Sequence, residues 1–127
     1  MGMFKQKVKV SNPEKSNLWF ENDFWIDTGA IYTLIPQNYL NKIQFEPEST
    51  RNIVLADGRT DRKLFGFCKF EIEGQEGKIT CPVIAGVDDS VFLLGATALE
   101  NFSLEVDPVN KRLHQVMAIM AGFIVSK

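Results

Sequence analysis

Short runs of strand-forming residues alternate with turn signals along most of this chain, and this spacing restricts the fold more than any other feature. The turn signals recur at roughly 8 to 12 residues, which is typical of all-β sandwiches and barrels. We expect strands at residues 4–10, 18–26, 31–35, 51–55, 60–73, 91–94 and 104–106. Short helices are expected at 36–42, with Pro36 in the first position, and at 96–101, and a bulge or break at 21–23. The pattern therefore predicts an all-β fold with one or two short helices.

Two turn sequences predict β-hairpins within this pattern. Asp57-Gly58 lies between strand-like runs, and an Asp-Gly pair in that position is one of the strongest short-range hairpin signals. A second hairpin is expected to turn near Gly74-Gln75. Its register would place apolar opposite apolar and acid opposite base, pairing Glu71 with Lys78, Phe70 with Ile79 and Cys68 with Cys81.

Length and charge limit the domain organisation and the partners. The 127 residues fit a single domain, of which residues 117–127 would form an apolar C-terminal extension. A net charge of −2 with scattered basic residues argues against nucleic acid as a partner. The N-terminus lacks the apolar run of a secretory signal, and the longest apolar stretch, 116–125, is about half the length that a membrane span needs. We therefore expect a cytoplasmic protein with no membrane span.

Cysteine and histidine are sparse in the sequence. Cys68 and Cys81 have no metal-ligand spacing and are too few for a disulfide framework, so we expect free thiols packed in the core. His114 is the only histidine, and a structural role is expected for it. No metal site and no cofactor are predicted.

One carboxylate is unusual in its position. The segment 24–30, Phe-Trp-Ile-Asp-Thr-Gly-Ala, places Asp27 directly after an apolar strand, in a turn that a glycine allows to bend sharply. An isolated Asp-Thr-Gly is more often a simple turn than a catalytic site. This sequence has a second motif of the type apolar-apolar-glycine, Leu93-Leu94-Gly95, near the C-terminus. A short helical stretch follows it.

This combination of elements resembles the retropepsin-like aspartic peptidases. The resemblance is carried by Ile26-Asp27-Thr28-Gly29-Ala30, the glycine-containing hairpin that follows, and Leu93-Leu94-Gly95-Ala96, and it covers residues 4–116. It is strongest to small cellular members of the clan in bacteria and archaea, through Asn12-Pro13, Leu55-Ala56-Asp57-Gly58-Arg59 and residues 94–100. The resemblance implies a closed β-barrel or sandwich of the acid protease type.

The resemblance also implies an activity and roles for individual residues. Asp27 would be the catalytic aspartate, Thr28 would link two subunits beneath the site, and Gly29 would hydrogen-bond a substrate through its backbone. The implied substrate-binding residues are Ala30, Ala56, Asp57 and Gly58, the last two at the tip of a flap. The family's chemistry needs two carboxylates around one water, and this chain has one motif, so a homodimer with an extended peptide as substrate is expected. The expected function is that of an aspartic endopeptidase.

The sequence departs from the viral members of the family in the flap, where Asp57 and Arg59 stand in place of a mostly glycine and apolar tip, and at two positions near the two motifs. Ile31 and Ala96 stand where the viral pattern has an acidic residue and an arginine, so an apolar contact would replace that ion pair. Two alternatives stay open: a catalytically silent dimeric module that grips a peptide with the same fold, and a domain of a longer polypeptide that a partner activates. The apolar tail at 117–127 could pack on its own domain, form a strand in the dimer interface, bind a partner or contact a membrane, and the resemblance to viral relatives favours the interface strand.

Overall fold

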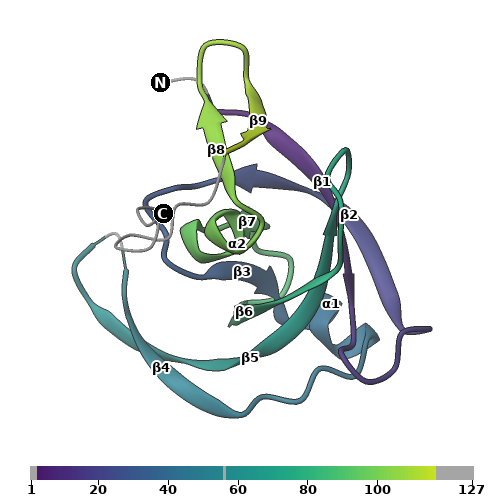
Figure 1. Ribbon diagram of the computed structural model, residues 1–127. Helices are drawn as coiled ribbons and strands as arrows, with labels where there is room; N and C mark the ends of the chain where they lie inside the picture. The colour runs from purple at the N-terminus through teal and green to yellow at the C-terminus, as the bar shows by residue number, and fades with distance from the viewer. Residues whose placement is uncertain (1–2, 56, 117–127) are drawn as a thin grey trace, which may run out of the picture.

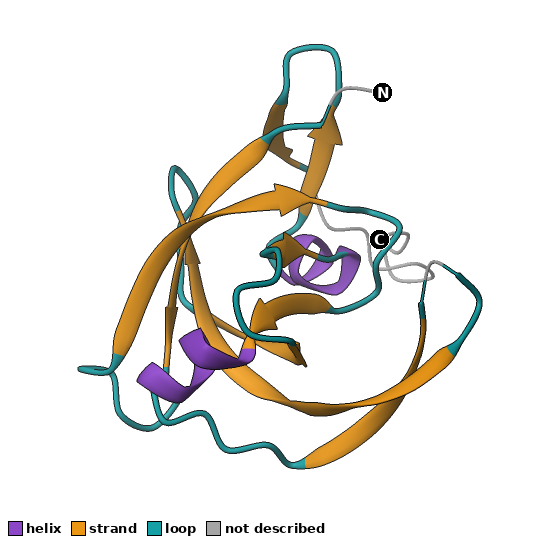
Figure 2. Cartoon of the chain, turned by 180° about the vertical axis from the view of Figure 1, so that it is seen from behind, coloured by secondary structure: helices purple, strands orange, loops and turns teal. Residues whose placement is uncertain are grey.

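The computed structural model describes residues 3–55 and 57–116. Strands dominate this part of the chain, and its two helices are short (Figures 1 and 2). The strands are β1 (Lys5–Ser11), β2 (Trp19–Ile26), β3 (Thr33–Pro36), β4 (Ser49–Val54), β5 (Thr60–Ile72), β6 (Ile79–Gly86), β7 (Leu93–Leu94), β8 (Leu104–Asp107) and β9 (Arg112–Gln115). The helices are α1 (Gln37–Lys42) and α2 (Ala96–Asn101). The predicted all-β fold with short helices is confirmed.

Seven of the strands form one sheet that closes on itself (Figure 1). Their order is β1-β2-β7-β3-β6-β5-β4, and β1 also pairs with β5. In this closing contact Val8 lies opposite Ile72 and Val10 opposite Phe70, and all four side chains are buried. The sheet therefore has the closed form that the resemblance implies, with the β4–β5 hairpin extending beyond the closure.

Parallel pairing brings together the segments that build the candidate site. β7 runs parallel to β2, with Ile26 opposite Leu94, and β3 runs parallel to β6. β7 also pairs with β3, where Leu34 lies opposite Leu93. The C-terminal end of β2 therefore lies against β7, which follows much later in the chain.

The core is filled by residues of the sheet and by one side of each helix. Phe24 of β2 and Phe70 of β5 are fully buried, with ring centroids 6.4 Å apart. Leu40 of α1 and Leu99 of α2 are buried against the same cluster. Removing a large apolar side chain of this kind from water contributes about 1.5 to 3 kcal/mol, so the packed interior holds the closed sheet together.

Both predicted hairpins are confirmed. β4 and β5 flank Asp57-Gly58. β5 and β6 pair with Phe70 opposite Ile79 and Cys68 opposite Cys81, and Lys78 Nζ lies 3.9 Å from a carboxylate oxygen of Glu71. The register that was expected from side-chain pairing is therefore the register of the structure.

Several details differ from the sequence expectations. β2 pairs with β1 without interruption from Trp19 to Trp25, so the break expected at 21–23 is wrong. Continuous backbone pairing overrides the weak strand preference of Glu-Asn-Asp there. β3 begins at Thr33 and not at 31, because the preceding residues belong to the loop after Asp27. Pro36 was expected to be the first residue of α1. It is instead the N-cap residue, with extended backbone, and the helix begins at Gln37.

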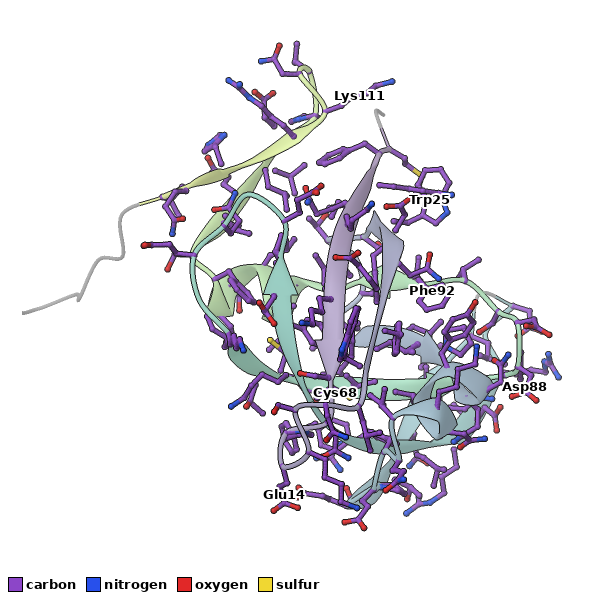
Figure 3. The ribbon with its side chains drawn as sticks, turned by 90° about the vertical axis from the view of Figure 1, so that its right-hand side faces the viewer. Glu14, Trp25, Cys68, Asp88, Phe92 and Lys111 are labelled. Carbon is purple, nitrogen blue, oxygen red and sulfur yellow. The ribbon has the colours of Figure 1, made fainter. Side chains whose placement is uncertain are left out.

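β8 and β9 form a separate two-stranded hairpin that projects from the sheet, with Lys111 near its tip (Figure 3). β9 was not expected from the sequence. Among the described residues, no helix has the length and apolar character needed to cross a membrane. The interface strand expected at 117–127 lies outside the described residues.

Candidate active site

Asp27 leaves the core at the end of β2. Ile26, the last residue of the strand, is buried, whereas Asp27 is half-buried. The Asp27 N–H donates to the Leu94 carbonyl over 3.0 Å, which continues the parallel pairing of β2 and β7 by one residue. The backbone of Asp27 is therefore fixed by the sheet, while its side chain is partly exposed beyond the end of β2.

The loop after Asp27 folds back on the carboxylate. The Gly29 N–H donates to Asp27 Oδ1 over 3.0 Å, and the Ala30 N–H donates to the Asp27 carbonyl over 3.2 Å. An aspartate side chain that accepts a backbone N–H two residues ahead stabilises a tight turn. Asp27 Oδ2 has no hydrogen-bond partner among the described residues. One carboxylate oxygen is thus held by the turn, and the other can meet water or a second carboxylate.

The start of α2 holds the other end of this loop. The Ala96 N–H donates to the Ala30 carbonyl over 2.7 Å, and the Thr97 N–H donates to the Ile31 carbonyl over 3.0 Å. The first N–H groups of a helix have no partner within the helix, so they are available for this contact. Two backbone hydrogen bonds thus fix the loop next to Ala96, the position where the viral pattern has an arginine.

Gly95 lies where two backbone segments come close together. A Cβ atom added at Gly95 would lie 2.5 Å from the Tyr32 carbonyl oxygen and 3.0 Å from the Ala30 carbonyl oxygen. These neighbours are backbone atoms, which cannot rotate away as a flexible side chain can. Only a glycine fits at this position without moving the loop that carries Asp27.

Thr33 stabilises the close approach of Gly95 to the Asp27 loop, and it was not identified from the sequence. Its side chain is 1 % exposed, and its hydroxyl accepts the buried N–H of Gly95 over 3.1 Å. A buried N–H without a partner costs free energy, so this hydroxyl stabilises the close approach of Gly95 to the loop. The signal in the sequence is a single polar residue among the apolar residues of its strand.

The tip of the β4–β5 hairpin is held by contacts within its own turn. The Leu55 N–H donates to the Arg59 carbonyl over 2.7 Å, and Gly58 adopts a positive φ of 88°. Asp57 Oδ1 accepts the Arg59 N–H over 3.0 Å, and Asp57 Oδ2 lies 2.6 Å from Arg59 Nε. The backbone N–H and then the guanidinium of Arg59 lower the pKa of Asp57 below its usual range. Both oxygens of Asp57 are therefore engaged by the turn.

The structure brings some of the expected site residues together and leaves others apart. Asp27, Thr28, Gly29 and Ala30 share one loop, which β7 and α2 hold. Asp57 and Gly58 lie at the tip of the other element, and no hydrogen bond joins them to that loop in the described part of the chain. Ala56 lies outside the described residues.

Tyr32 connects the loop to the hairpin that carries Asp57. Its ring meets the ring of Phe65 on β5 in an edge-on contact, with centroids 5.2 Å apart. Phe65 lies near the base of the β4–β5 hairpin, opposite Ser49. One face of the hairpin base therefore packs against the segment that follows Asp27.

Thr28 is exposed beside a depression in the surface. The depression has a volume of about 430 Å³, and its walls include Leu99 and Glu100 of α2 and Leu104 and Val106 of β8. Apolar and polar groups both line it. This face, next to Asp27, is open to a further molecule.

The remaining titratable groups that sequence analysis considered have structural surroundings. Burial raises the pKa of Cys68 to about 12, with a smaller contribution from Cys81, and burial raises the pKa of Cys81 to about 11. Both are free thiols in the core, as expected. The His114 ring lies 3.0 Å from a Glu105 oxygen. Within 3–55 and 57–116, no group of three or more potential ligands has the arrangement of a metal site.

Comparison with solved structures shows which known proteins share this fold. The protease of simian foamy virus (mac) is 18% identical over 76% of this chain and 92% of its own, with a TM-score of 0.53. A retropepsin-like aspartic protease from Rickettsia conorii is 18% identical over 83% of this chain and 87% of its own, with a TM-score of 0.54. The EIAV protease, solved with the inhibitor HBY-793, is 16% identical over 77% of this chain and 86% of its own, with a TM-score of 0.55.

Comparison with protein families and with curated sequences gives two further results. No curated protein sequence matches the chain. The family model of the gag-polyprotein putative aspartyl protease matches residues 20–101, which is more than half of the chain and includes the Asp27 loop, the β4–β5 hairpin and α2. The chain therefore belongs to the gag-polyprotein putative aspartyl protease family, and it has a retropepsin-like fold.

Proposed function

We propose that this protein is an aspartic endopeptidase that acts as a homodimer, with one Asp27 from each copy. The two carboxylates would share one proton around a water molecule. The ionised carboxylate takes a proton from the water, whose oxygen attacks the scissile carbonyl carbon, while the protonated carboxylate donates a hydrogen bond to the carbonyl oxygen. Proton transfer to the amide nitrogen then allows the carbon–nitrogen bond to break.

The geometry of Asp27 is the observation that carries this proposal. Gly29 holds Oδ1, and Oδ2 has no partner among the described residues. The surrounding loop is fixed by Leu94 on one side and by Ala96 on the other. A carboxylate in a rigid loop, with one oxygen available, is suited to proton transfer because its position costs no reorganisation during the reaction.

The need for a second copy follows from the number of carboxylates. Each chain supplies one Asp-Thr-Gly motif, so a dyad requires two chains related by a twofold axis. Thr28 would lie at that axis, and the depression between Thr28, α2 and β8 gives a surface on which the second copy can pack. The exposed apolar side chain of Ile31, which directly follows Ala30, favours association further.

The substrate would be an extended peptide between the Asp27 loop and the β4–β5 hairpin. Gly29 and Ala30 would contact it from the loop, and the hairpin tip at Asp57-Gly58 would cover it as a flap. Because both oxygens of Asp57 are engaged by Arg59, the tip would contact the peptide through backbone groups. An extended peptide leaves its own N–H and C=O groups available for such contacts.

Cleavage of a mixed peptide library between roughly pH 3 and pH 8 tests the proposal. The native chain is compared with Asp27→Asn at a concentration that analytical ultracentrifugation shows to be dimeric. The matched control is Asp88→Asn, which also removes one carboxylate, from an exposed residue in the loop between β6 and β7. We expect cleavage by the native chain and by Asp88→Asn, with a bell-shaped pH profile, and none by Asp27→Asn.

Mixing the native chain with excess Asp27→Asn tests the shared dyad. If each site needs two Asp27 carboxylates, mixed dimers are inactive, and activity falls more steeply than the fraction of native chain. A fall no steeper than the fraction of native chain would mean that a site does not need both carboxylates. A dimer that binds peptides but cleaves none of them at any pH would instead support the silent peptide-binding module.

A further inference from the structure

One face of the β4–β5 hairpin is turned toward the loop that carries Asp27. Residues directly opposite each other in an antiparallel pair point to the same side, and the side alternates along each strand. Phe65 contacts Tyr32 from the loop segment, which identifies the inner face. The pairs that share this face are Ser49 with Phe65, Arg51 with Lys63, and Ile53 with Asp61. On the opposite face Val54 is 71% exposed, as expected for a surface turned to solvent.

The charged residues on and next to the inner face differ in their partners. Lys63 Nζ lies 3.2 Å from an Asp61 oxygen, and Arg59 Nε lies 2.6 Å from an Asp57 oxygen. These cations are therefore neutralised locally. Arg51 forms no ion pair with a carboxylate among the described residues.

The guanidinium of Arg51 is nevertheless held in place. Its central carbon lies 3.8 Å from the centroid of the Phe65 ring, and Nη1 donates to Ser49 Oγ over 2.8 Å and to the Thr50 carbonyl over 3.1 Å. Arg51 is half-buried. Its Nε and Nη2 groups have no acceptor within the described part of the chain. An oriented cation with unused donors thus lies where the hairpin meets the Asp27 loop.

We propose that Arg51 determines specificity by binding an acidic side chain of the peptide substrate. This inference rests on the proposed peptidase function and names the substrate class of the same site. A planar guanidinium with adjacent free N–H groups matches the two oxygens of a carboxylate, and such charge-assisted pairs are stronger than neutral hydrogen bonds. Stacking on Phe65 fixes the guanidinium before the peptide arrives, so little side-chain entropy is lost on binding.

The test compares paired peptides that differ only in one Glu or Gln. A cleaved sequence is varied at each position around the scissile bond, and all peptides carry an amidated C-terminus, so that a side chain is the only variable carboxylate. For the native chain we expect kcat/KM to be about tenfold higher with Glu at one position, the size expected for a hydrogen bond between charged groups. The Arg51→Met variant keeps an aliphatic stem over Phe65, and the Glu-to-Gln ratio should fall to about one.

A second cation on the same hairpin provides the matched control. Arg62 lies on the outer face opposite Asn52, and its Nη1 donates to Asn52 Oδ1 over 3.1 Å. Arg62→Met removes the same charge, and we expect it to keep the native Glu-to-Gln ratio. Arg51→Glu should reverse the preference, so that Lys is favoured over Gln at that position. Because each result is a ratio on one preparation, loss of folded protein does not change it.

The outcomes separate this inference from the proposed function. Cleavage with a ratio of about one at every position, or a preference that persists in Arg51→Met, would overturn the role of Arg51 and leave the peptidase standing. A preference lost equally in Arg62→Met would assign it to the general charge of the hairpin and also overturn the role of Arg51. No cleavage of any peptide by the native dimer would remove the peptidase itself, and this inference with it.

Discussion

The turns at Asp27 and at Asp57 share one side-chain hydrogen bond and differ in their surroundings. In each, the aspartate Oδ1 accepts the backbone N–H of the residue two positions ahead, over 3.0 Å in both cases. At Asp57 the second oxygen lies 2.6 Å from Arg59 Nε, whereas at Asp27 the second oxygen has no partner among the described residues. The same turn chemistry therefore closes a hairpin in one place and presents a carboxylate in the other.

The two turns also differ in what holds them. The Asp27 loop donates one backbone hydrogen bond to the Leu94 carbonyl and accepts two from the N–H groups of Ala96 and Thr97, and these three residues belong to elements far away in the sequence. The Asp57 turn is held by Leu55, Gly58 and Arg59, all within its own hairpin. This difference teaches that the Asp27 loop depends on the whole fold, while the hairpin tip is nearly independent of it. Substitutions should therefore have unequal effects at the two places.

The largest difference is expected for alanine in place of the two glycines. At Gly95 the new Cβ would lie 2.5 Å from a backbone oxygen, so Gly95→Ala should lower the free energy of unfolding by about 3 kcal/mol and displace the Asp27 loop. At Gly58 the added Cβ has no neighbour within 4 Å, and only its positive φ opposes the change, so Gly58→Ala should cost about 1 kcal/mol. Urea denaturation measures both values. Equal costs would contradict the proposed difference between the two turns.

A smaller effect is expected from the hydroxyl beneath Gly95. Thr33→Val keeps the shape of the side chain but leaves the Gly95 N–H buried without an acceptor, which should cost about 2 kcal/mol. Thr33→Ser keeps the acceptor and loses a methyl group, at a cost of about 0.8 kcal/mol. Denaturation of the two variants under the same conditions separates the hydrogen bond from the packing. If Thr33→Ser were the less stable of the two, packing and not the hydroxyl would support Gly95.

The smallest effect is expected at the ion pair of the hairpin tip. The backbone N–H and the guanidinium of Arg59 both lower the pKa of Asp57, so Arg59→Gln should raise that pKa part of the way to its usual value. Because the folded-state pKa is lowered, the stabilisation is complete above the usual pKa and is lost as the pH falls through the lowered one. Carbon-13 NMR of the Asp57 carboxyl follows the titration directly. For this exposed pair the denaturation midpoint at neutral pH should not change measurably.

The parts of the structure that could be predicted from sequence are those whose partners lie close together in the chain. Asp57-Gly58 indicated one hairpin, and the alternation around Gly74 gave the pairing of Cys68 with Cys81. In a hairpin the turn residues and the side-chain pattern of the two flanking strands determine the register, and both lie within one short segment. The Asp27 loop was found because the motif itself is local.

The contacts that were missed join distant segments or lack a periodic pattern. The Thr33 hydroxyl and the Gly95 N–H are separated by 62 positions, and neither residue indicates the other. The parallel pairing of β2 with β7 also joins segments that lie far apart in the sequence and do not indicate each other. β9 contains one buried apolar residue, Leu113, so it shows no alternation that would mark a strand. A break in the strand was expected at Glu21, Asn22 and Asp23. It does not form, because these residues pair with β1 without interruption.

The pairing of β1 with β5 has a consequence for how the chain reaches its native state. The first strand of the chain completes its pairing only with the last residues of β5, as the contact of Val8 with Ile72 shows. The entropy of closing this long loop is lost before the buried contact is gained, which makes such pairings slow steps in folding. We therefore expect substitutions at this contact to change the refolding rate, and a ribosome-bound chain to remain open until β5 has emerged.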